Sequence, residues 1–262
     1  MSVLLLDFES TGIDTKTARV TEIGAMITDM DLNPGERLSQ LVWAPDYPAI
    51  TPEVTAVTGI TQEMLDADGV LPDVAFGMLG DMVLRSEVKF VIAYNRNYDE
   101  NLFRAEIERL TSTHLAMPYL ATTPWLCAMV DIESNYQKKC WKLSHLALDY
   151  GVAVDPKKLH RAINDVELMR EMMGAAGATP MGMYEYQRSP WVYVVAKTRA
   201  PWEDNGKSTG AAKELGFSWQ QCKGDDSGRT FDKRWVKRIK HKDFAKLQQD
   251  AGFEVALIGG VS

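Results

Sequence analysis

Residues 3–12 read VLLLDFESTG, and this stretch decides the fold at the N-terminal end of the chain. The first four residues are apolar and end at an acid, which is typical of a short strand buried on both faces. Asp7 and Glu9 are two residues apart, and in a strand such residues project from the same face. Two carboxylates so close repel each other, and a bound cation relieves that conflict. The same acids also fit the start of a surface turn, because Ser-Thr-Gly follows them.

The residues after this stretch predict an α/β domain with a mixed sheet flanked by helices. Apolar and alternating runs predict strands, and apolar residues at helical spacing predict helices. We expect strands over 3–6, 19–28, 40–44 and 89–93, and helices starting at Thr51, Thr61 and Asp99 and covering 73–84, 143–150 and 164–173. Strands come first and helices alternate with them later, which favours a mixed sheet over a purely parallel one.

The small-residue stretch GAAGATPMG, residues 174–182, predicts a domain boundary. We therefore expect one domain over residues 1–178 and a second over 183–262. In the second, WVYVVAK and FEVALIG predict strands, and the residues between them predict a short helix, a hairpin strand and another helix. The expected architecture is an α/β body with a small α+β C-terminal appendage.

Composition bounds the class of protein. With 262 residues, 45% of them hydrophobic and 25% charged, the chain can bury a core. No run approaches the ~18 apolar residues that span a bilayer, so we expect no membrane partner. The N-terminus has no basic segment and is expected to be a strand, not a signal peptide. Three widely spaced cysteines argue against a disulfide framework and a zinc knuckle, and favour a reducing, cytoplasmic setting.

Three further residues extend the acidic pair. Asp99 follows the strand expected over 89–93, Asp165 lies in the first turn of the last expected helix, and His160 precedes it by five residues. Taken singly, each acid also fits a helix N-terminus, where the helix dipole favours negative charge, and the histidine also fits an ordinary surface position. If they converge, four carboxylates can hold two hard divalent cations and the histidine can accept a proton.

Together the three segments resemble the DEDDh branch of the 3'-to-5' exonuclease superfamily, which includes the proofreading subunit of bacterial replicative polymerases. The resemblance covers residues 3–175, roughly two thirds of the chain. The matching motifs are Asp7-Phe8-Glu9-Ser10-Thr11-Gly12, then Tyr94-Asn95 followed by Tyr98-Asp99, and finally His160 with Asp165 after four intervening residues. Two positions depart from the family pattern, because Ser10 replaces a commoner threonine and Tyr94 stands where a histidine is often found. Neither removes a carboxylate, but both leave the nucleotide preference open.

The resemblance implies a ribonuclease H-like fold and a two-metal mechanism. Two Mg²⁺ or Mn²⁺ ions would be held by the four carboxylates, and His160 would act as the general base. The product would be a nucleoside 5'-monophosphate. The metal ligands implied are Asp7, Glu9, Asp99 and Asp165, and the residues implied to line the 3'-terminal nucleotide are Ser10, Thr11, Gly12 and Asn95.

Charge is distributed unevenly along the chain. Residues 1–180 carry 15 Lys+Arg against 26 Asp+Glu, whereas residues 181–262 carry 14 against 10. Eight of these basic residues fall within 229–246, where Trp219, Phe231 and Trp235 lie inside or beside the run. Basic side chains with aromatic rings are typical of single-strand binding, although the same rings could instead form the core of a small domain. The candidate nucleic-acid-binding residues are Lys233, Arg234, Trp235, Lys237 and Arg238.

The function expected from the sequence is a 3'-to-5' exonuclease acting on a single strand, with DNA favoured over RNA. An exoribonuclease or short-oligonucleotide hydrolase is the alternative within enzymes, because the same five residues serve both sugars. A non-catalytic nucleic-acid-binding module is an alternative from another class. A further alternative is a proofreading subunit bound to a DNA polymerase, or to another replication or repair protein, through residues 183–262.

Overall fold

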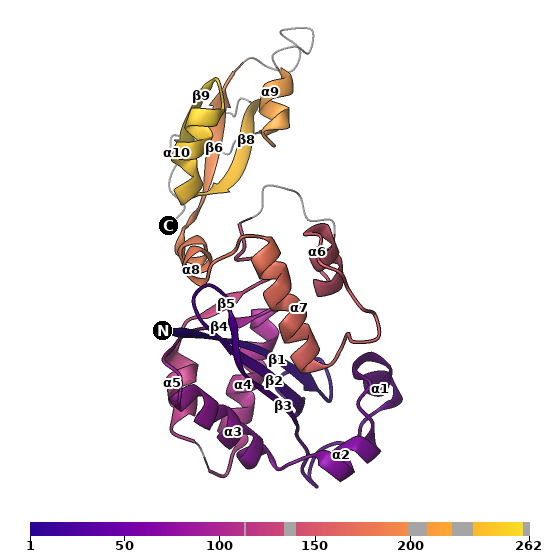
Figure 1. Ribbon diagram of the computed structural model, residues 1–262. Helices are drawn as coiled ribbons and strands as arrows, with labels where there is room; N and C mark the ends of the chain where they lie inside the picture. Colours follow the sequence, from indigo (N-terminus) through magenta and orange to yellow (C-terminus); the bar gives the residue numbers. More distant parts are fainter. Residues whose placement is uncertain (113, 134–139, 199–208, 222–232, 259–262) are drawn as a thin grey trace. The chain divides into compact units, whose positions relative to one another are not determined.

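The structure is a computed structural model that describes residues 1–112, 114–133, 140–198, 209–221 and 233–258 (Figure 1). The chain divides into two compact units, Met1–Tyr184 and Glu185–Ser262. Among the helices of the described residues, none is both long enough and apolar enough to cross a membrane.

The first unit is built on a five-stranded mixed sheet with the strand order β3-β2-β1-β4-β5. Pairing is antiparallel from β3 through β2 to β1, and parallel from β1 through β4 to β5. The strands are β1 Ser2–Ser10, β2 Val20–Thr28, β3 Pro34–Leu41, β4 Val88–Ala93 and β5 Trp125–Cys127. The mixed sheet expected from the sequence is confirmed.

Helices pack on both faces of this sheet, α3 to α5 on one face and α6 and α7 on the other. The helices of residues 1–188 are α1 Pro52–Thr58, α2 Gln62–Asp68, α3 Pro72–Leu84, α4 Arg96–Arg109, α5 Ala116–Thr122, α6 Leu143–Asp149, α7 Ala162–Ala175 and α8 Pro180–Arg188. The two starts expected at Thr51 and Thr61 are confirmed, because each hydroxyl accepts a hydrogen bond from the backbone N–H three residues later. These caps satisfy donors that a helix start otherwise leaves unpaired.

Alternation along β1 assigns its side chains to two hydrophobic cores. Leu4, Leu6 and Phe8 pack with residues of α3, α4 and α5. Val3 and Leu5 pack on the other face with residues of α6 and α7. Figure 1 shows α7 lying across β1 and β2 on this second face. Alternate residues of a strand share a face, so Asp7 and Glu9 follow Val3 and Leu5 on the face that packs against α7.

The third strand lies earlier in the chain than expected. We predicted residues 40–44, but β3 runs from Pro34 to Leu41. The prediction was wrong because β3 is an edge strand whose first four residues are exposed, so it lacks the apolar signal of a buried strand. The apolar residue Val42 instead forms an isolated bridge to Val70. The short elements α5 and β5 were not predicted.

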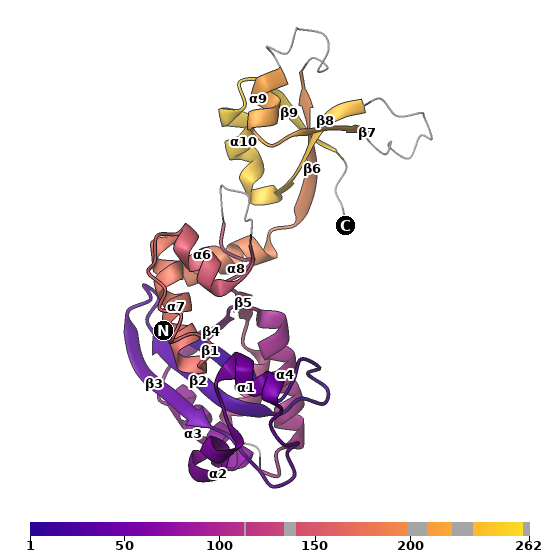
Figure 2. The same ribbon diagram turned by 90° about the vertical axis from the view of Figure 1, so that its right-hand side faces the viewer.

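The second unit contains a four-stranded antiparallel sheet with the order β7-β8-β6-β9. Its elements are β6 Trp191–Lys197, α9 Thr209–Glu214, β7 Ser218–Gln221, β8 Lys233–Lys240, the short 3-10 helix His241–Asp243, α10 Phe244–Asp250 and β9 Glu254–Ile258. The order is therefore β-α-β-β-α-β, and Figure 2 shows α9 and α10 on the same side of the sheet. The small α+β appendage expected from the sequence has this architecture.

The stretch 174–182, expected to be a domain boundary, is partly helical. α7 continues to Ala175 and α8 begins at Pro180, so only four residues of the 174–182 stretch connect the two helices. The two units divide between Tyr184 and Glu185, a few residues further on. Small residues at a helix end give the same sequence signal as a linker.

Candidate active site

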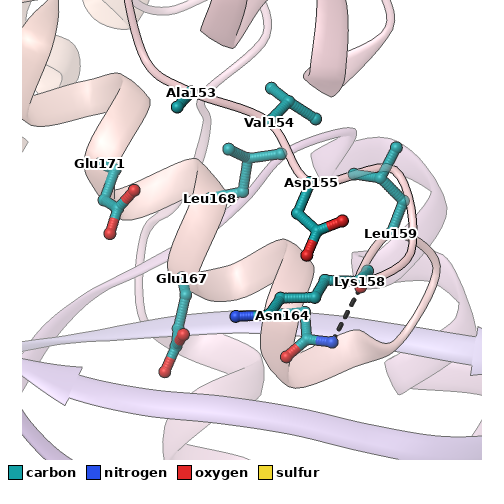
Figure 3. Close-up of a pocket in the computed structure, with 9 residues that line it drawn as sticks. All are labelled: Ala153, Val154, Asp155, Lys158, Leu159, Asn164, Glu167, Leu168 and Glu171. Carbon is teal, nitrogen blue, oxygen red and sulfur yellow. Dashed lines mark hydrogen bonds between the residues drawn. The ribbon is translucent and has the colours of Figure 1, made fainter.

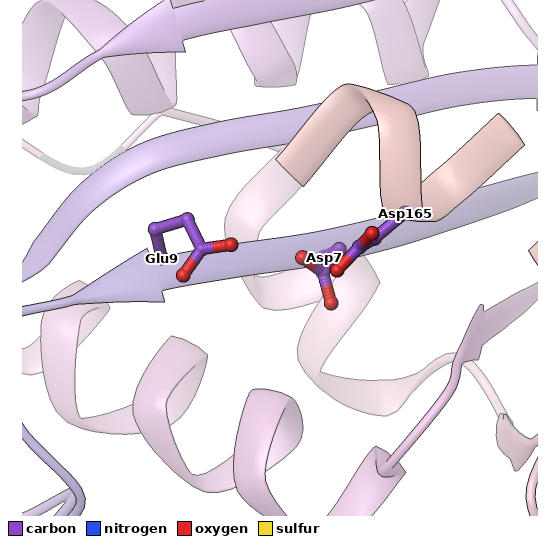
Figure 4. A group of neighbouring side chains, drawn as sticks. All are labelled: Asp7, Glu9 and Asp165. Carbon is purple, nitrogen blue, oxygen red and sulfur yellow. The ribbon is translucent and has the colours of Figure 1, made fainter. Parts of the chain in front are cut away.

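Three carboxylates meet at the end of β1. Oxygen atoms of Asp7, Glu9 and Asp165 lie within 4.8 Å of one another (Figure 4). The first two project from one face of β1, and Asp165 lies in the first turn of α7. The pairing of β1 with β2 shifts register directly after Glu9, and such bulges often occur next to active sites. The sheet and the helix start together bring the three acids to one place.

Asp99 lies beside this group and is hydrogen-bonded to β1. Its carboxylate Oδ1 accepts a hydrogen bond from the backbone N–H of Phe8 at 3.2 Å, and the residue is only 3% exposed. Pairing between β1 and β4 ends at Leu5, so the acid takes over a backbone donor that β4 no longer reaches. Because α4 begins at Arg96, Asp99 lies in its first turn and not at its first residue as expected.

Burial and mutual repulsion raise the pKa values of these carboxyl groups. Burial, followed by the charges of Asp99, Glu9 and Asp165, raises the pKa of Asp7 well above its ordinary value. Burial and the charge of Asp165 raise the pKa of Glu9 to about 8. Burial raises the pKa of Asp99 to about 7, although the hydrogen bond from Phe8 opposes the shift. The pKa of Asp165 is also raised by burial, with His160 acting in the opposite direction.

This arrangement fits a site for hard divalent cations. Within the ranges that the structure describes, no lysine or arginine forms an ion pair with Asp7, Glu9 or Asp165. Carboxylate oxygens are the ligands that Mg²⁺ and Mn²⁺ prefer, and an added cation offsets the repulsion that raises their pKa values. The donor set therefore suits the metal ions that the sequence implied.

His160 lies next to the cluster through its backbone. Its N–H points to Oδ1 of Asp165 at 3.4 Å, while the residue itself is exposed. Its φ is 63°, in the left-handed region that few residues other than glycine and asparagine adopt readily. The loop therefore ties the histidine backbone to one member of the carboxylate cluster and leaves the residue at the surface of the site.

The turn after Glu9 is held by a tyrosine from α4. The Tyr98 hydroxyl donates to the carbonyl oxygen of Gly12 at 2.6 Å and also contacts the hydroxyl of Ser10. The Ser10 hydroxyl lies 2.8 Å from the same carbonyl. Both expected pocket residues therefore belong to a compact turn beside the carboxylates, and Tyr98, for which the sequence suggested no separate role, fixes that turn.

The other two expected pocket residues have different surroundings. Thr11 pairs with Arg19, whose backbone N–H donates to the threonine hydroxyl at 3.0 Å, so this hydroxyl closes the loop that follows β1. Asn95 is exposed immediately before α4, four residues ahead of Asp99. Both residues therefore lie close in sequence to the acids. The Thr11 side chain has a structural hydrogen bond, whereas Asn95 is exposed.

Two residues that the sequence did not single out anchor the start of α7. Glu22 on β2 is fully buried, and both of its oxygens accept hydrogen bonds from the Arg161 guanidinium, at 2.8 and 3.0 Å. The backbone N–H of Ala162, the first residue of α7, donates to the same carboxylate at 3.1 Å. Since Glu22 pairs with Glu9 across the two strands, this contact fixes α7 directly beside the acidic cluster.

Gly24 allows α7 to approach the sheet this closely. A Cβ atom at this position would lie 2.2 Å from the carbonyl carbon of Ala162, which no side chain can tolerate. Gly24 pairs with Asp7 on β1, so the close approach of α7 occurs next to a member of the carboxylate cluster. A buried acid inside the otherwise apolar strand VTEIGAMIT was the sequence signal that could have identified Glu22.

A hollow beside α7 lies under the loop that leads to His160 (Figure 3). Its lining is mainly polar and includes Asp155, Lys158, Glu167 and Glu171. The side-chain amide of Asn164 donates to the carbonyl oxygen of Lys158 at 2.8 Å, as the dashed line in Figure 3 shows. This bond fastens the loop to the first turn of α7, one residue before Asp165.

The basic candidates of the second unit do not form one surface. Trp235 is buried in the core of this unit against Trp219, with ring centroids 5.5 Å apart, so it is not available to stack on a base. Alternation along β8 places Lys237 on the same face as Trp235, and Arg234 and Arg238 on the opposite face. The sequence left open whether these rings bind a strand or form the core of a small domain, and Trp235 lies in the core. Phe231 and Arg229 lie outside the described residues.

Comparison with known proteins identifies the family. Residues 4–172 match the family model RNase_T, described as Exonuclease. The chain belongs to this exonuclease family. It is of the DEDD type, and the resemblance drawn from the three sequence motifs is confirmed.

Two relatives of the chain are DNA polymerase III proteins. The chain is 25% identical over 202 residues to a DNA polymerase III PolC-type from Thermotoga maritima, a match that covers 74% of this chain but only 14% of that protein. It is 27% identical over 166 residues to the DNA polymerase III subunit epsilon of Treponema pallidum, covering 63% of this chain and 72% of that subunit. The match thus spans about one seventh of the PolC-type relative.

Solved structures share the fold. Escherichia coli exonuclease I in its zinc-bound complex with single-stranded DNA has a TM-score of 0.59 at 16% identity, over 97% of this chain and 64% of that one. The same enzyme with a dA16 oligonucleotide has a TM-score of 0.59 at 14% identity, over the same shares of the two chains. At such low identity the likeness shows the fold, which is the expected ribonuclease H-like one.

Proposed function

We propose that this exonuclease is metal-dependent, removes nucleotides from the 3' end of single-stranded DNA and releases nucleoside 5'-monophosphates. The observation that carries the proposal is the meeting of Asp7, Glu9 and Asp165 within 4.8 Å, with Asp99 hydrogen-bonded beside them. All four acids lie inside the residues that match the family.

The carboxylates and the histidine divide the chemistry. Asp7, Glu9, Asp99 and Asp165 would hold two Mg²⁺ or Mn²⁺ ions. When bound, the ions would acidify the attacking water and neutralise charge on the phosphate. His160, tied to Asp165 through its backbone, accepts the proton of that water as general base.

The turn of residues 10–12 would receive the terminal nucleotide. It is fixed by the Tyr98 hydroxyl on one side and by the pairing of Thr11 with Arg19 on the other. A turn that is already ordered would position the terminal nucleotide and its phosphate at little entropic cost. Asn95, exposed at the start of α4, would complete this pocket.

The test uses DNA and RNA oligonucleotides of one sequence, labelled at either end, with Mg²⁺, Mn²⁺ or EDTA. We expect 5'-labelled DNA to shorten stepwise and 3'-labelled DNA to release a labelled mononucleotide at once, with no reaction in EDTA. Internal cuts, or cleavage that persists in EDTA, would contradict the proposal. Faster cleavage of the RNA strand would replace it with the exoribonuclease alternative.

Association with a DNA polymerase is a second candidate, which the names of the two relatives favour. A proofreading subunit must receive the primer end from a polymerase, and the second unit offers a surface for such contact. Stoichiometric co-purification with a polymerase of the same cell, lost on truncation after residue 184, would support this role. Purification without any polymerase would argue for an independent exonuclease.

A further inference from the structure

The sheet of the second unit has one face packed on its helices and one that carries exposed rings. Val192 and Val194 of β6 belong to the core that includes residues of α9 and α10. Trp191 and Tyr193 alternate with them and project from the opposite face, where each is 40% exposed. Two large aromatic side chains that share an exposed strand face leave apolar surface in water, which often marks a binding site.

Basic side chains from β8 lie directly opposite these rings. The register pairs Tyr193 with Arg238 and Trp191 with Lys240. The Arg238 guanidinium carbon lies 4.8 Å from the centroid of the Trp191 ring, and Nζ of Lys240 lies at the same distance. Both contacts are in the range of cation–π attraction, so these cations help to fix the position of the ring.

The two cations have different surroundings. Lys240 is only 6% exposed and its Nζ also donates to the carbonyl oxygen of Ser189 at 2.9 Å, so its position is fixed within the protein. Arg238 is exposed, as is Arg234 four residues earlier on the same face. The exposed guanidinium groups are therefore the ones placed to meet a charged ligand.

A third ring extends the row of aromatics. Tyr186 of α8 packs edge-on against Trp191, with ring centroids 6.4 Å apart. Nζ of Lys240 and Nζ of Lys242 lie 5.0 and 5.1 Å from the centroid of its ring. Tyr186, Trp191 and Tyr193, interleaved with the cations of β8, are referred to below as the aromatic face.

The charge of this face is positive. Among the described strand residues that project from it, four are cationic, namely Lys197, Arg234, Arg238 and Lys240. The one acid there, Glu254, forms an ion pair with Lys197. The ligand that such a face complements is therefore a polyanion with flat apolar groups. A single nucleic-acid strand has both, with phosphates at regular intervals and unpaired bases between them.

We propose that the aromatic face binds a single strand of nucleic acid, with Trp191 and Tyr193 stacking on bases and Arg234 and Arg238 contacting phosphates. An antiparallel four-stranded sheet with helices on one face is a known platform for base stacking. The role of this binding rests on the proposed function, because the aromatic face would keep the substrate strand bound between cleavage steps. Its binding test does not depend on cleavage.

The test measures binding of the full chain to a fluorescent single strand of roughly 16 nucleotides in EDTA, by anisotropy. Tyr193→Leu removes a ring and keeps apolar bulk, and Kd should rise about 5- to 150-fold because stacking contributes about 1–3 kcal/mol per base. Tyr193→Phe keeps the ring and should bind like wild type. Equal affinity of wild type and Tyr193→Leu would overturn the proposal.

Charge is tested separately with a matched pair of variants. Arg238→Gln should weaken binding and lower the slope of log Kd against log salt by about 0.7, the value for one phosphate contact on a single strand. Lys213→Gln removes one positive charge from α9, on the helix-covered side, and should leave both quantities unchanged. An equal effect of the two substitutions would show unspecific attraction and contradict the proposal.

Duplex DNA of the same length separates stacking from charge. Because paired bases cannot stack on a sheet face, duplex should bind more weakly than the single strand, and Tyr193→Leu should not affect it. Duplex binding as tight as that of the single strand would overturn the proposal. Absence of metal-dependent cleavage by wild type would instead contradict the proposed exonuclease function, so the two failures are distinguishable.

Discussion

The first unit contains fully buried acids and a cluster of half-buried acids, and the two groups differ in their partners. Glu22 and Glu106 are both fully buried, and each forms ion pairs with arginine. Glu22 binds Arg161 beside the start of α7, and Glu106 binds Arg19 with a hydrogen bond of 2.9 Å. Both glutamates also accept a backbone N–H, so their charge is neutralised and hydrogen-bonded within the chain.

The carboxylate cluster, by contrast, gathers acids that the chain itself does not neutralise. Asp7, Glu9 and Asp165 lie within 4.8 Å of one another, and no arginine of the described residues pairs with them. Keeping several like charges close together and partly removed from water is costly, so a fold that does so has another use for them. The paired acids stabilise contacts between elements of the fold, whereas the cluster is suited to bind a metal cation from solution.

The strongest way to break this comparison is to remove one member of the cluster. Asp7→Asn should lower turnover about a thousandfold or more, since metal ligation supplies several kcal/mol of transition-state stabilisation. The unfolding temperature in EDTA should not fall, because one source of repulsion disappears. Single-turnover cleavage and calorimetry measure both effects. Glu108→Gln, an exposed acid on α4, is the control. Turnover within tenfold of wild type would contradict the role of the cluster.

The second prediction contrasts the arginines that pair with Glu22 and Glu106 with His160, whose side chain can release and accept a proton. An arginine stays protonated at any working pH, but His160 can serve as base, so its loss should slow turnover by ~10². His160→Asn is the suitable variant, because asparagine tolerates the left-handed backbone found there. The pH–rate profile should lose its acidic limb. A profile identical to that of wild type would exclude the general-base role, and His145→Asn on α6 provides the control.

The third prediction separates the two paired acids from each other. Glu22→Gln should lower the free energy of unfolding by about 1–3 kcal/mol, because Arg161 and the start of α7 lose a charged partner. Displacement of α7 should also reduce kcat about tenfold. Glu106→Gln should cost comparable stability but raise KM instead, since Arg19 holds the loop of Thr11. Urea titrations and steady-state kinetics measure both. Identical kinetic effects would show that neither glutamate has a positioning role.

The fourth prediction concerns pH and the metal-free protein. Burial and neighbouring charges raise the pKa of Glu9 from 4.5 to about 8, so the folded state keeps a proton that the unfolded chain releases. Stability in EDTA should therefore fall as the pH rises between 4.5 and about 8, and level off above that. We expect an unfolding temperature lower by about 5 °C at the alkaline end. Added Mg²⁺ should remove the difference, and a flat profile in EDTA would contradict the assignment.

The smallest effect is expected from an ion pair that water already screens. Arg37 on β3 pairs with Glu167 on α7, and their side chains are 49% and 37% exposed. Arg37→Gln should change the free energy of unfolding by less than about 0.5 kcal/mol, because exposed pairs contribute little. Urea denaturation measures this change. A loss as large as that of Glu22→Gln would show that burial does not explain the contrast between paired acids.

Strand alternation predicted the pairing of two of the acids, and the family resemblance predicted that the others join them. Asp7 and Glu9 share a strand face by alternation, and Asp165 is fixed to a helix start. Asp99 was placed correctly near a helix start but not at a hydrogen bond to β1, since that contact joins residues 91 positions apart. Spacing along the chain carries no information about such a contact, whereas a resemblance to a family does.

The remaining differences arise where neighbours, and not the local sequence, decide the structure. β3 was misplaced because an edge strand needs no apolar residues on its outer positions. The aromatic face was missed because Trp191 and Arg238 belong to strands that are distant in sequence and paired in the sheet. Alternation along β8 separates the basic run into two faces, with Trp235 on the core side and Arg234 and Arg238 on the other.

Asp99 has a consequence for surveys of related sequences. Its carboxylate closes the edge of β1 at Phe8 whether or not the protein cuts nucleic acid. A descendant that had lost catalysis would still gain from keeping an acid or amide at this position. Glu9, for which the described residues show no hydrogen bond to its side chain, would have no such reason to persist. Loss of the glutamate is therefore the better early marker of an inactive relative, and retention of Asp99 is weak evidence of activity.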